Sequence, residues 1–123
     1  MTTTFIDTHA HLDGEEFQND LPEVIARAKA AGVEKIFVPA IDLVHLPDVM
    51  NVCRKYPDTL HPMIGLHPEE VRADWKDVLK NMKQHLLDNL AGTNDEPRCI
   101  AVGEVGLDYY WSREYEHEQL EAF

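Results

Sequence analysis

Phe5–Asp13 carries the sequence FIDTHAHLD, whose centre is the triplet His9-Ala10-His11. Its apolar start, Phe5-Ile6, predicts a short buried strand. Because side chains alternate between the two faces of a strand, we expect both histidines on one side, about 6.6 Å apart along the chain. Two imidazoles arranged in this way can bind one metal ion, and zinc favours them. The same pattern is compatible with two ordinary histidines in a polar turn.

The composition indicates a globular protein. The chain has 123 residues, of which 44% are hydrophobic and 28% are charged, enough for one domain with a modest core. Its net charge of -12 counts against broad nucleic-acid binding, because phosphates are repelled by an acidic surface. Bound divalent cations would nevertheless supply positive charge locally.

The cellular location is predicted from the chain start and the cysteines. The start, MTTTF, has neither the basic nor the apolar segment of a secretory signal, and no run approaches the ~18 apolar residues of a membrane helix. Cys53 and Cys99 are the only cysteines, and neither belongs to a CxxC pair. We therefore expect a cytoplasmic protein with reduced, buried thiols and no membrane partner.

Apolar stretches alternate with segments of helical periodicity along the chain. The predicted strands are Thr4–His9, Lys35–Pro39, Leu60–Leu66 and Cys99–Val105. The predicted helices are Leu21–Ala31 (with Asp20 as its cap and Gly32 as its stop), His45–Tyr56, Asp74–Leu90 (followed by Gly92) and a final helix that Ser112 could cap and that reaches Phe123. This order predicts an α/β domain over residues 1–123 with a parallel sheet and right-handed crossovers.

Polar residues lie at the carboxyl ends of all four predicted strands. They are His9 and His11, Asp42, His67 and Glu104. In parallel α/β folds this edge of the sheet binds ligands, so the four strand ends predict one common site. Glu104, between Gly103 and Gly106, could bridge two metal ions, or it could pair with an arginine or a helix N-terminus.

Other polar residues near this edge have both a chemical and a structural interpretation. His67 could contact a substrate phosphate or carboxylate, or bond to backbone. Asp108 and Tyr109 leave the fourth strand with Tyr110 and could line a substrate pocket or anchor the loop. Asp7 could orient a ligand histidine. No chemistry is assigned to the remaining histidines, His45, His61, His85 and His117. The absence of GxSxG, P-loop and GxGxxG motifs leaves serine catalysis, nucleotide hydrolysis and Rossmann cofactors without support.

Three passages in this order resemble the TatD family of metal-dependent hydrolases. They are FIDTHAHLD, IGLHPEE at Ile64–Glu70 and AVGEVGLDYYW at Ala101–Trp111. The resemblance implies a parallel (β/α)₈ barrel of the TIM type, with an amidohydrolase-like centre of two divalent metal ions, Zn²⁺, Mn²⁺ or Mg²⁺. His9 and His11 match metal ligands, Glu104 matches the catalytic carboxylate shared by the metals, and His67 matches a position near the substrate phosphate. The implied activity is hydrolysis of phosphodiester bonds in DNA, including 3′-end exonuclease action, or of a smaller phosphoester.

The chain departs from the family in length. A whole barrel needs about 250 residues and eight strands, whereas four strands are predicted here. The family's later ligands, two histidines and an aspartate, have no counterpart. We therefore expect the first four βα units, a half barrel, completed by a carboxy-terminal half or by a second copy joined through the open edges. The alternatives are an amidohydrolase acting on a small C–N or ester substrate, and an inactive metal-binding or assembly domain.

Overall fold

The computed structural model describes residues 3–123; Met1 and Thr2, within the MTTTF start, lie outside the described residues. Strands and helices alternate as the sequence predicts. The strands are β1 (Phe5–Asp7), β2 (Val33–Pro39), β3 (Leu60–Ile64) and β4 (Ala101–Val102). The α-helices are α1 (Leu21–Ala30), α2 (Leu46–Lys55), α3 (Trp75–Ala91) and α4 (Glu116–Ala122). Two 3₁₀ helices, η1 (Glu15–Phe17) and η2 (Pro68–Glu70), follow β1 and β3.

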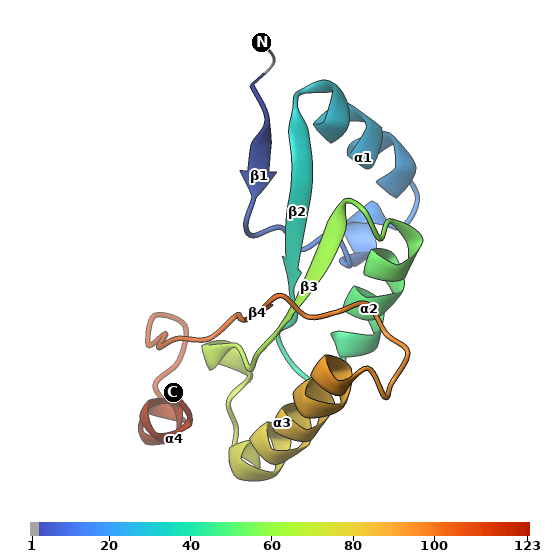
Figure 1. The fold of residues 1–123 in the computed structure, drawn as a ribbon. Coiled ribbons are helices and arrows are strands. Elements are labelled where there is room, and N and C mark those ends of the chain that lie inside the picture. Colours follow the sequence, from blue (N-terminus) through green and yellow to red (C-terminus); the bar gives the residue numbers. More distant parts are fainter. Residues whose placement is uncertain (1–2) are drawn as a thin grey trace.

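The four strands form one parallel sheet in the order β1-β2-β3-β4 (Figure 1). Each strand lies beside the next one in the sequence, with a helix in the connection. Phe5 is in register with Val33, and Met63 is in register with Ala101. This arrangement is half of a TIM barrel, so the predicted fold class is confirmed.

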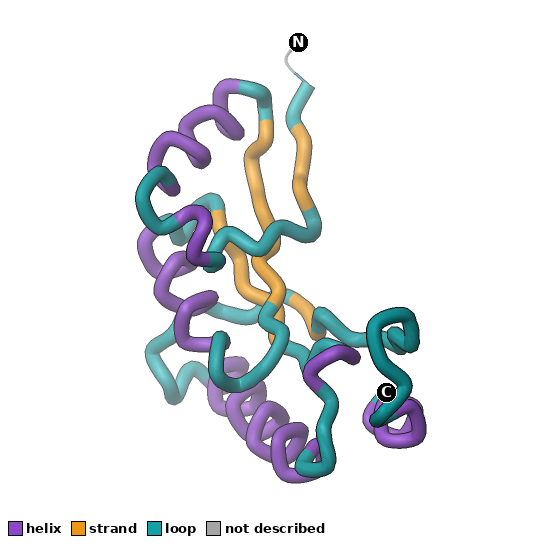
Figure 2. Tube along the Cα trace, turned by 180° about the vertical axis from the view of Figure 1, so that it is seen from behind, coloured by secondary structure: helices purple, strands orange, loops and turns teal. Residues whose placement is uncertain are grey.

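Helices α1, α2 and α3 lie along one side of the strands in both views (Figure 2). The core lies between them and the sheet. Helix α2 contributes the side chains of Leu46, Val49, Met50 and Cys53, each at most 2% exposed. Full burial of an aliphatic side chain of this size stabilises the fold by about 1.5–3 kcal/mol. These side chains therefore form the side of α2 that faces the sheet.

The two edges of the sheet are open. Within residues 3–123, β1 and β4 each have a strand neighbour on one side only. Phe5 and Ile6 on β1 are 53% and 56% exposed, and Val102 on β4 is 62% exposed. The expectation that Phe5-Ile6 is buried is wrong, because β1 is an edge strand that no described element covers.

The outer strands are shorter than predicted because local hydrogen bonds end their ladders. Strand β1 stops at Asp7, whose Oδ1 accepts a hydrogen bond from the backbone N–H of His9 at 3.0 Å. Strand β4 stops at Val102 because the chain then crosses toward β2. The backbone N–H of Glu104 donates to Ala40 O at 3.1 Å rather than to β3.

Two helix starts also differ from prediction. Helix α4 begins at Glu116, so Ser112 does not cap it. Ser112 Oγ instead accepts a hydrogen bond from Glu114 N–H in a turn that precedes the helix. Asp20 precedes α1 but makes no side-chain hydrogen bond to cap it. By contrast, Gly32 and Gly92 follow α1 and α3 with φ angles of +93° and +76°, the left-handed conformation that favours glycine at these stops.

Both cysteines are buried and free, as predicted. Burial raises the pKa of the Cys53 thiol to about 12 and that of the Cys99 thiol to about 11. Among residues 3–123, none of the helices combines the length and the hydropathy that crossing a bilayer requires.

Candidate metal centre

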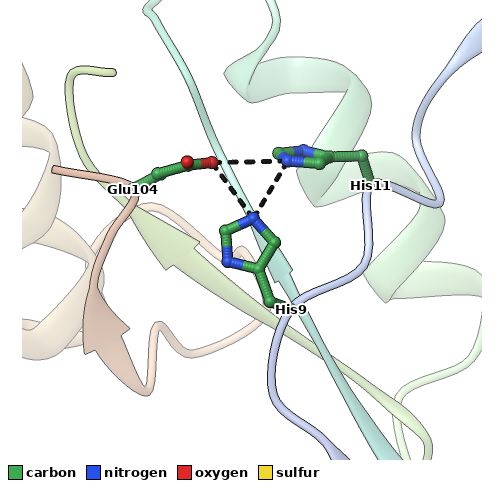
Figure 3. A group of neighbouring side chains, drawn as sticks. All are labelled: His9, His11 and Glu104. Carbon is green, nitrogen blue, oxygen red and sulfur yellow. Dashed lines mark hydrogen bonds and ion pairs between the residues drawn. The ribbon is translucent and has the colours of Figure 1, made fainter. Parts of the chain in front are cut away.

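Three side chains converge at the carboxyl end of the sheet: His9, His11 and Glu104 (Figure 3). His9 Nε2 lies 3.1 Å from His11 Nε2 and 3.1 Å from Glu104 Oε2. His11 Nε2 lies 3.3 Å from the same carboxylate oxygen. The structure thus brings together the three residues that the sequence singles out as metal ligands.

A turn, rather than strand alternation, sets the positions of the two histidines. Both follow the end of β1, contrary to the expectation that His9 lies within the strand. Asp7 Oδ1 holds the backbone N–H of His9, and Ala10 N–H donates to Phe37 O of β2 at 3.1 Å. Asp7, predicted to orient a ligand histidine, therefore contacts the backbone of His9.

Glu104 is positioned by the backbones of two neighbouring strands. Gly103 N–H donates to Ile64 O of β3 at 2.8 Å, and Glu104 N–H donates to Ala40 O after β2. The crossing is tight, since a Cβ on Gly65 would lie only 2.6 Å from the carbonyl carbon of Gly103. Glycine at residue 65 therefore lets the segment that carries Glu104 pass over β3 toward the histidines.

His67 lies on the other side of the same carboxylate. Its Nε2 is 3.2 Å from Glu104 Oε1, and its Nδ1 accepts a hydrogen bond from Glu69 N–H at 3.0 Å. Because Nδ1 acts as an acceptor, the neutral ring carries its proton on Nε2. His67 thus presents an N–H donor to the site, which suits contact with a carboxylate or a phosphate and not with a cation.

The donor set fits a divalent metal ion. Glu104 Oε2 is buried and accepts no hydrogen bond from the described residues, although two imidazole nitrogens lie within 3.3 Å. A buried carboxylate oxygen without a partner is costly, and a cation between the three atoms would compensate for it. Ligand atoms around a tetrahedral Zn²⁺ at 2.0–2.1 Å are about 3.3 Å apart, close to the distances found here. The His9 and His11 side chains are 47% and 42% exposed, so the centre is accessible from solvent.

Asp42 does not join this centre, although it follows β2 at the same edge. Its Oδ1 accepts a hydrogen bond from His45 N–H at 2.7 Å and lies 2.8 Å from His45 Nδ1. This contact with Asp42 raises the pKa of His45, which lies on the surface. Asp42 therefore organises the start of α2.

Asp108 and Tyr109, the predicted substrate contacts, occupy the loop after β4 and have different surroundings. Asp108 borders a cavity of about 350 Å³ between η2 and this loop. Tyr109 does not line that cavity and lies beneath the guanidinium of Arg113, 5.2 Å from ring centroid to Cζ. Two further lining residues, Arg72 and Trp111, were not singled out by the sequence analysis. The aromatic run YYW was the available signal for Trp111.

The comparisons with known proteins agree with this geometry. A family model described as TatD related DNase matches residues 6–123. The chain belongs to the TatD family. It is 35% identical over 117 residues to the "Uncharacterized metal-dependent hydrolase YabD" of Bacillus subtilis (strain 168), a match that covers 95% of this chain and 42% of YabD. The "3'-5' ssDNA/RNA exonuclease TatD" of Pectobacterium carotovorum subsp. carotovorum (strain PC1) is 27% identical over 95% of the chain and 42% of the exonuclease.

A solved TatD homologue has the same arrangement of elements. The crystal structure of YjjV from Escherichia coli K12 matches with a TM-score of 0.81 and 32% identity. The match covers 96% of this chain and 43% of YjjV. This TatD chain therefore spans less than half the length of the relatives that it matches.

Proposed function

We propose that this TatD chain contributes the first part of a two-metal centre that hydrolyses phosphodiester bonds of DNA or of a smaller phosphoester. The observation that carries the proposal is the convergence of His9 Nε2, His11 Nε2 and Glu104 Oε2, with the carboxylate oxygen buried and without a hydrogen bond from any residue in 3–123. The names of the relatives, metal-dependent hydrolases and a ssDNA/RNA exonuclease, support the same class of reaction.

Each residue has a distinct role in this proposal. His9 and His11 would hold an ion through Nε2, and Glu104 would be the shared carboxylate. Divalent ions, Zn²⁺, Mn²⁺ or Mg²⁺, would supply Lewis-acid activation and neutralise negative charge on the phosphate. In the chain without substrate the Nε2–H of His67 faces Glu104 Oε1, and in the complex it would donate to a phosphate oxygen that lies beside Glu104. Asp108 and Tyr109 would contact the substrate from the loop after β4.

The charge of the chain favours a short or single-stranded substrate over long duplex DNA. With a net charge of -12, the chain lacks the excess of lysine and arginine on which duplex affinity depends. Two buried free thiols are consistent with a cytoplasmic location, which remains part of the proposal.

For the 123-residue chain by itself, we propose that a second copy completes the barrel. The chain would form one domain, and the exposed edges β1 and β4 would pair in parallel with those of the other copy to close eight strands. Each copy would bring its own His9, His11 and Glu104 to the shared carboxyl edge. Light scattering after size exclusion should then give twice the chain mass of 14.1 kDa. A monomer at all concentrations would contradict this pairing and would leave a carboxy-terminal half as the missing part.

Metal content tests the centre directly. Elemental analysis of the untagged chain should give stoichiometric metal, and the double variant His9→Ala/His11→Ala should lose it. The control is His117→Ala, which removes a surface histidine that pairs with Glu121 at 3.1 Å on α4. Absence of metal from the wild-type chain would contradict the proposal and favour an inactive half domain.

Turnover separates the possible reactions. We expect metal-dependent cleavage of a phosphodiester such as bis-nitrophenyl phosphate, abolished by His11→Ala and kept by His117→Ala. Cleavage of an amide or ester, with no cleavage of phosphodiesters, would instead assign an amidohydrolase reaction.

A further inference from the structure

Tyr110 and Trp111 form an exposed aromatic pair in the loop after β4. Their side chains are 82% and 74% exposed, and their rings meet edge to face with centroids 4.7 Å apart. They belong to the loop that follows Glu104 and β4 at the carboxyl end of the sheet. Two large aromatic side chains in water are unfavourable unless another group covers them.

The loop that carries this pair is held firmly by α4. Gln119, only 4% exposed, donates from Nε2 to Asp108 O at 2.9 Å, and its Oε1 accepts from Asp108 N–H at 2.8 Å. Asp108 Oδ1 in turn accepts from Tyr110 N–H at 2.9 Å. Because these bonds fix the backbone beside Trp111, a ligand that stacks on the indole would lose less free energy to the ordering of the loop.

Trp111 lines a cavity of about 350 Å³ between this loop and η2, which lie near one another in both views (Figures 1 and 2). Arg72 lines it, with its guanidinium over the Tyr115 ring at 5.7 Å. The cavity is close to the metal centre, because η2 directly follows His67 and Glu69 N–H donates to the His67 ring. A ligand that extends from the centre past His67 would therefore reach Glu69 at the wall of this cavity.

The lining of the cavity selects the kind of group that it can accept. Its charged residues are four carboxylates, from Glu69, Glu70, Asp108 and Glu114, and one guanidinium, from Arg72. This excess of negative charge disfavours a phosphate. An apolar protein surface would remove the same charged groups from water without giving them partners. A neutral ring with a flat face can stack on the indole, and its polar edge can form hydrogen bonds with the polar lining.

We propose that Trp111, oriented by Tyr110, stacks an unpaired nucleobase of a single-stranded nucleic acid, with the polar edge of the base in the cavity beside Arg72. This inference rests on the proposed function, which places the phosphate next to the stacked base near His67 and the metal ligands. A duplex keeps its bases stacked on one another, so the subsite selects single-stranded ends.

Fluorescence of Trp111 tests the stacking without turnover. The chain has two tryptophans, and Trp75→Phe leaves Trp111 as the only one. A short oligothymidylate should quench this fluorescence both in buffer that contains a metal chelator and in buffer that contains Mn²⁺. It should bind roughly 5- to 150-fold more tightly than the same oligomer without bases, which is the range expected for stacking of one base. Trp111→Ala should remove this preference, and Trp111→Phe should restore much of it. Binding to both variants is measured with a fluorescent label on the oligomer.

Leu87→Ala is the matched control, because Leu87 is an exposed apolar residue on α3 that does not line the cavity. It should keep the preference for the oligomer that contains bases. Absence of quenching at millimolar oligomer, or equal preference in wild type and Trp111→Ala, would overturn the inference. Metal content and phosphodiester turnover are measured separately, so loss of the base preference with an intact metal centre would reject the stacking alone.

Discussion

His67 Nε2 lies 3.2 Å from Glu104 Oε1, while Nδ1 of the same ring accepts the backbone N–H of Glu69. This relationship links the end of β3 to the candidate ligand that follows β4. The bond to Glu69 holds the ring and keeps the proton of the neutral imidazole on the nitrogen that faces the carboxylate. The other carboxylate oxygen, Oε2, is left facing His9 and His11.

We therefore expect His67→Asn to weaken metal binding by about 10- to 100-fold, the usual effect of losing a group that orients a ligand. Asparagine is too short to hold Glu104 in the same way. Titration calorimetry with Mn²⁺ or Zn²⁺ measures the change. His85→Asn is the control, since His85 lies on α3 and its Nε2 is 2.6 Å from Glu96 Oε2, with no contact to Glu104. Unchanged affinity in His67→Asn would show that His67 does not position the carboxylate.

The close crossing at Gly65 makes a prediction about stability. Gly65→Ala should lower the free energy of unfolding by about 1–3 kcal/mol, because its methyl group would lie 2.6 Å from the backbone of Gly103. Urea denaturation measures the change. Gly103→Ala is a milder comparison, since the nearest atom to its Cβ, 3.4 Å away, is the flexible end of Met63. Equal stability of Gly65→Ala and wild type would contradict the tight crossing.

The two thiols should be unreactive in the folded chain. Burial raises the pKa of Cys53 to about 12 and that of Cys99 to about 11, so very little thiolate forms at pH 8. Ellman's reagent should therefore label neither cysteine in buffer and both in guanidinium chloride. Rapid labelling of Cys53 without denaturant would indicate that the core between α2 and the sheet opens easily, and rapid labelling of Cys99 would indicate the same of its contact with Asn89 on α3.

His45 should titrate above its ordinary pKa of 6.5, because the carboxylate of Asp42 stabilises the charged ring. Since the folded-state pKa is raised, the stabilisation is complete below pH 6.5 and disappears as the pH rises through the folded-state value. Its size is small, because the His45 side chain is half exposed to water. An NMR titration of the ring should show the pKa fall in Asp42→Asn, and an unchanged pKa in that variant would exclude Asp42 as the cause.

The sequence alone determined the alternation of strands and helices, the parallel sheet and the edge at which polar residues gather. These features depend on local periodicity and on the rule that parallel strands end at the same edge. The spacing of FIDTHAHLD, IGLHPEE and AVGEVGLDYYW was also sufficient to point to the TatD family, because each motif is contiguous in the chain.

Only the tertiary structure decided how the site is assembled. The turn after Asp7, the crossing of Glu104 from β3 to Ala40 and the proton position on His67 all depend on hydrogen bonds whose partners could not be read from local pattern. The exposure of Phe5 likewise depends on what lies beside β1 in space. Local patterns predict which elements form, whereas burial and ligand geometry are set by contacts between segments far apart in the sequence.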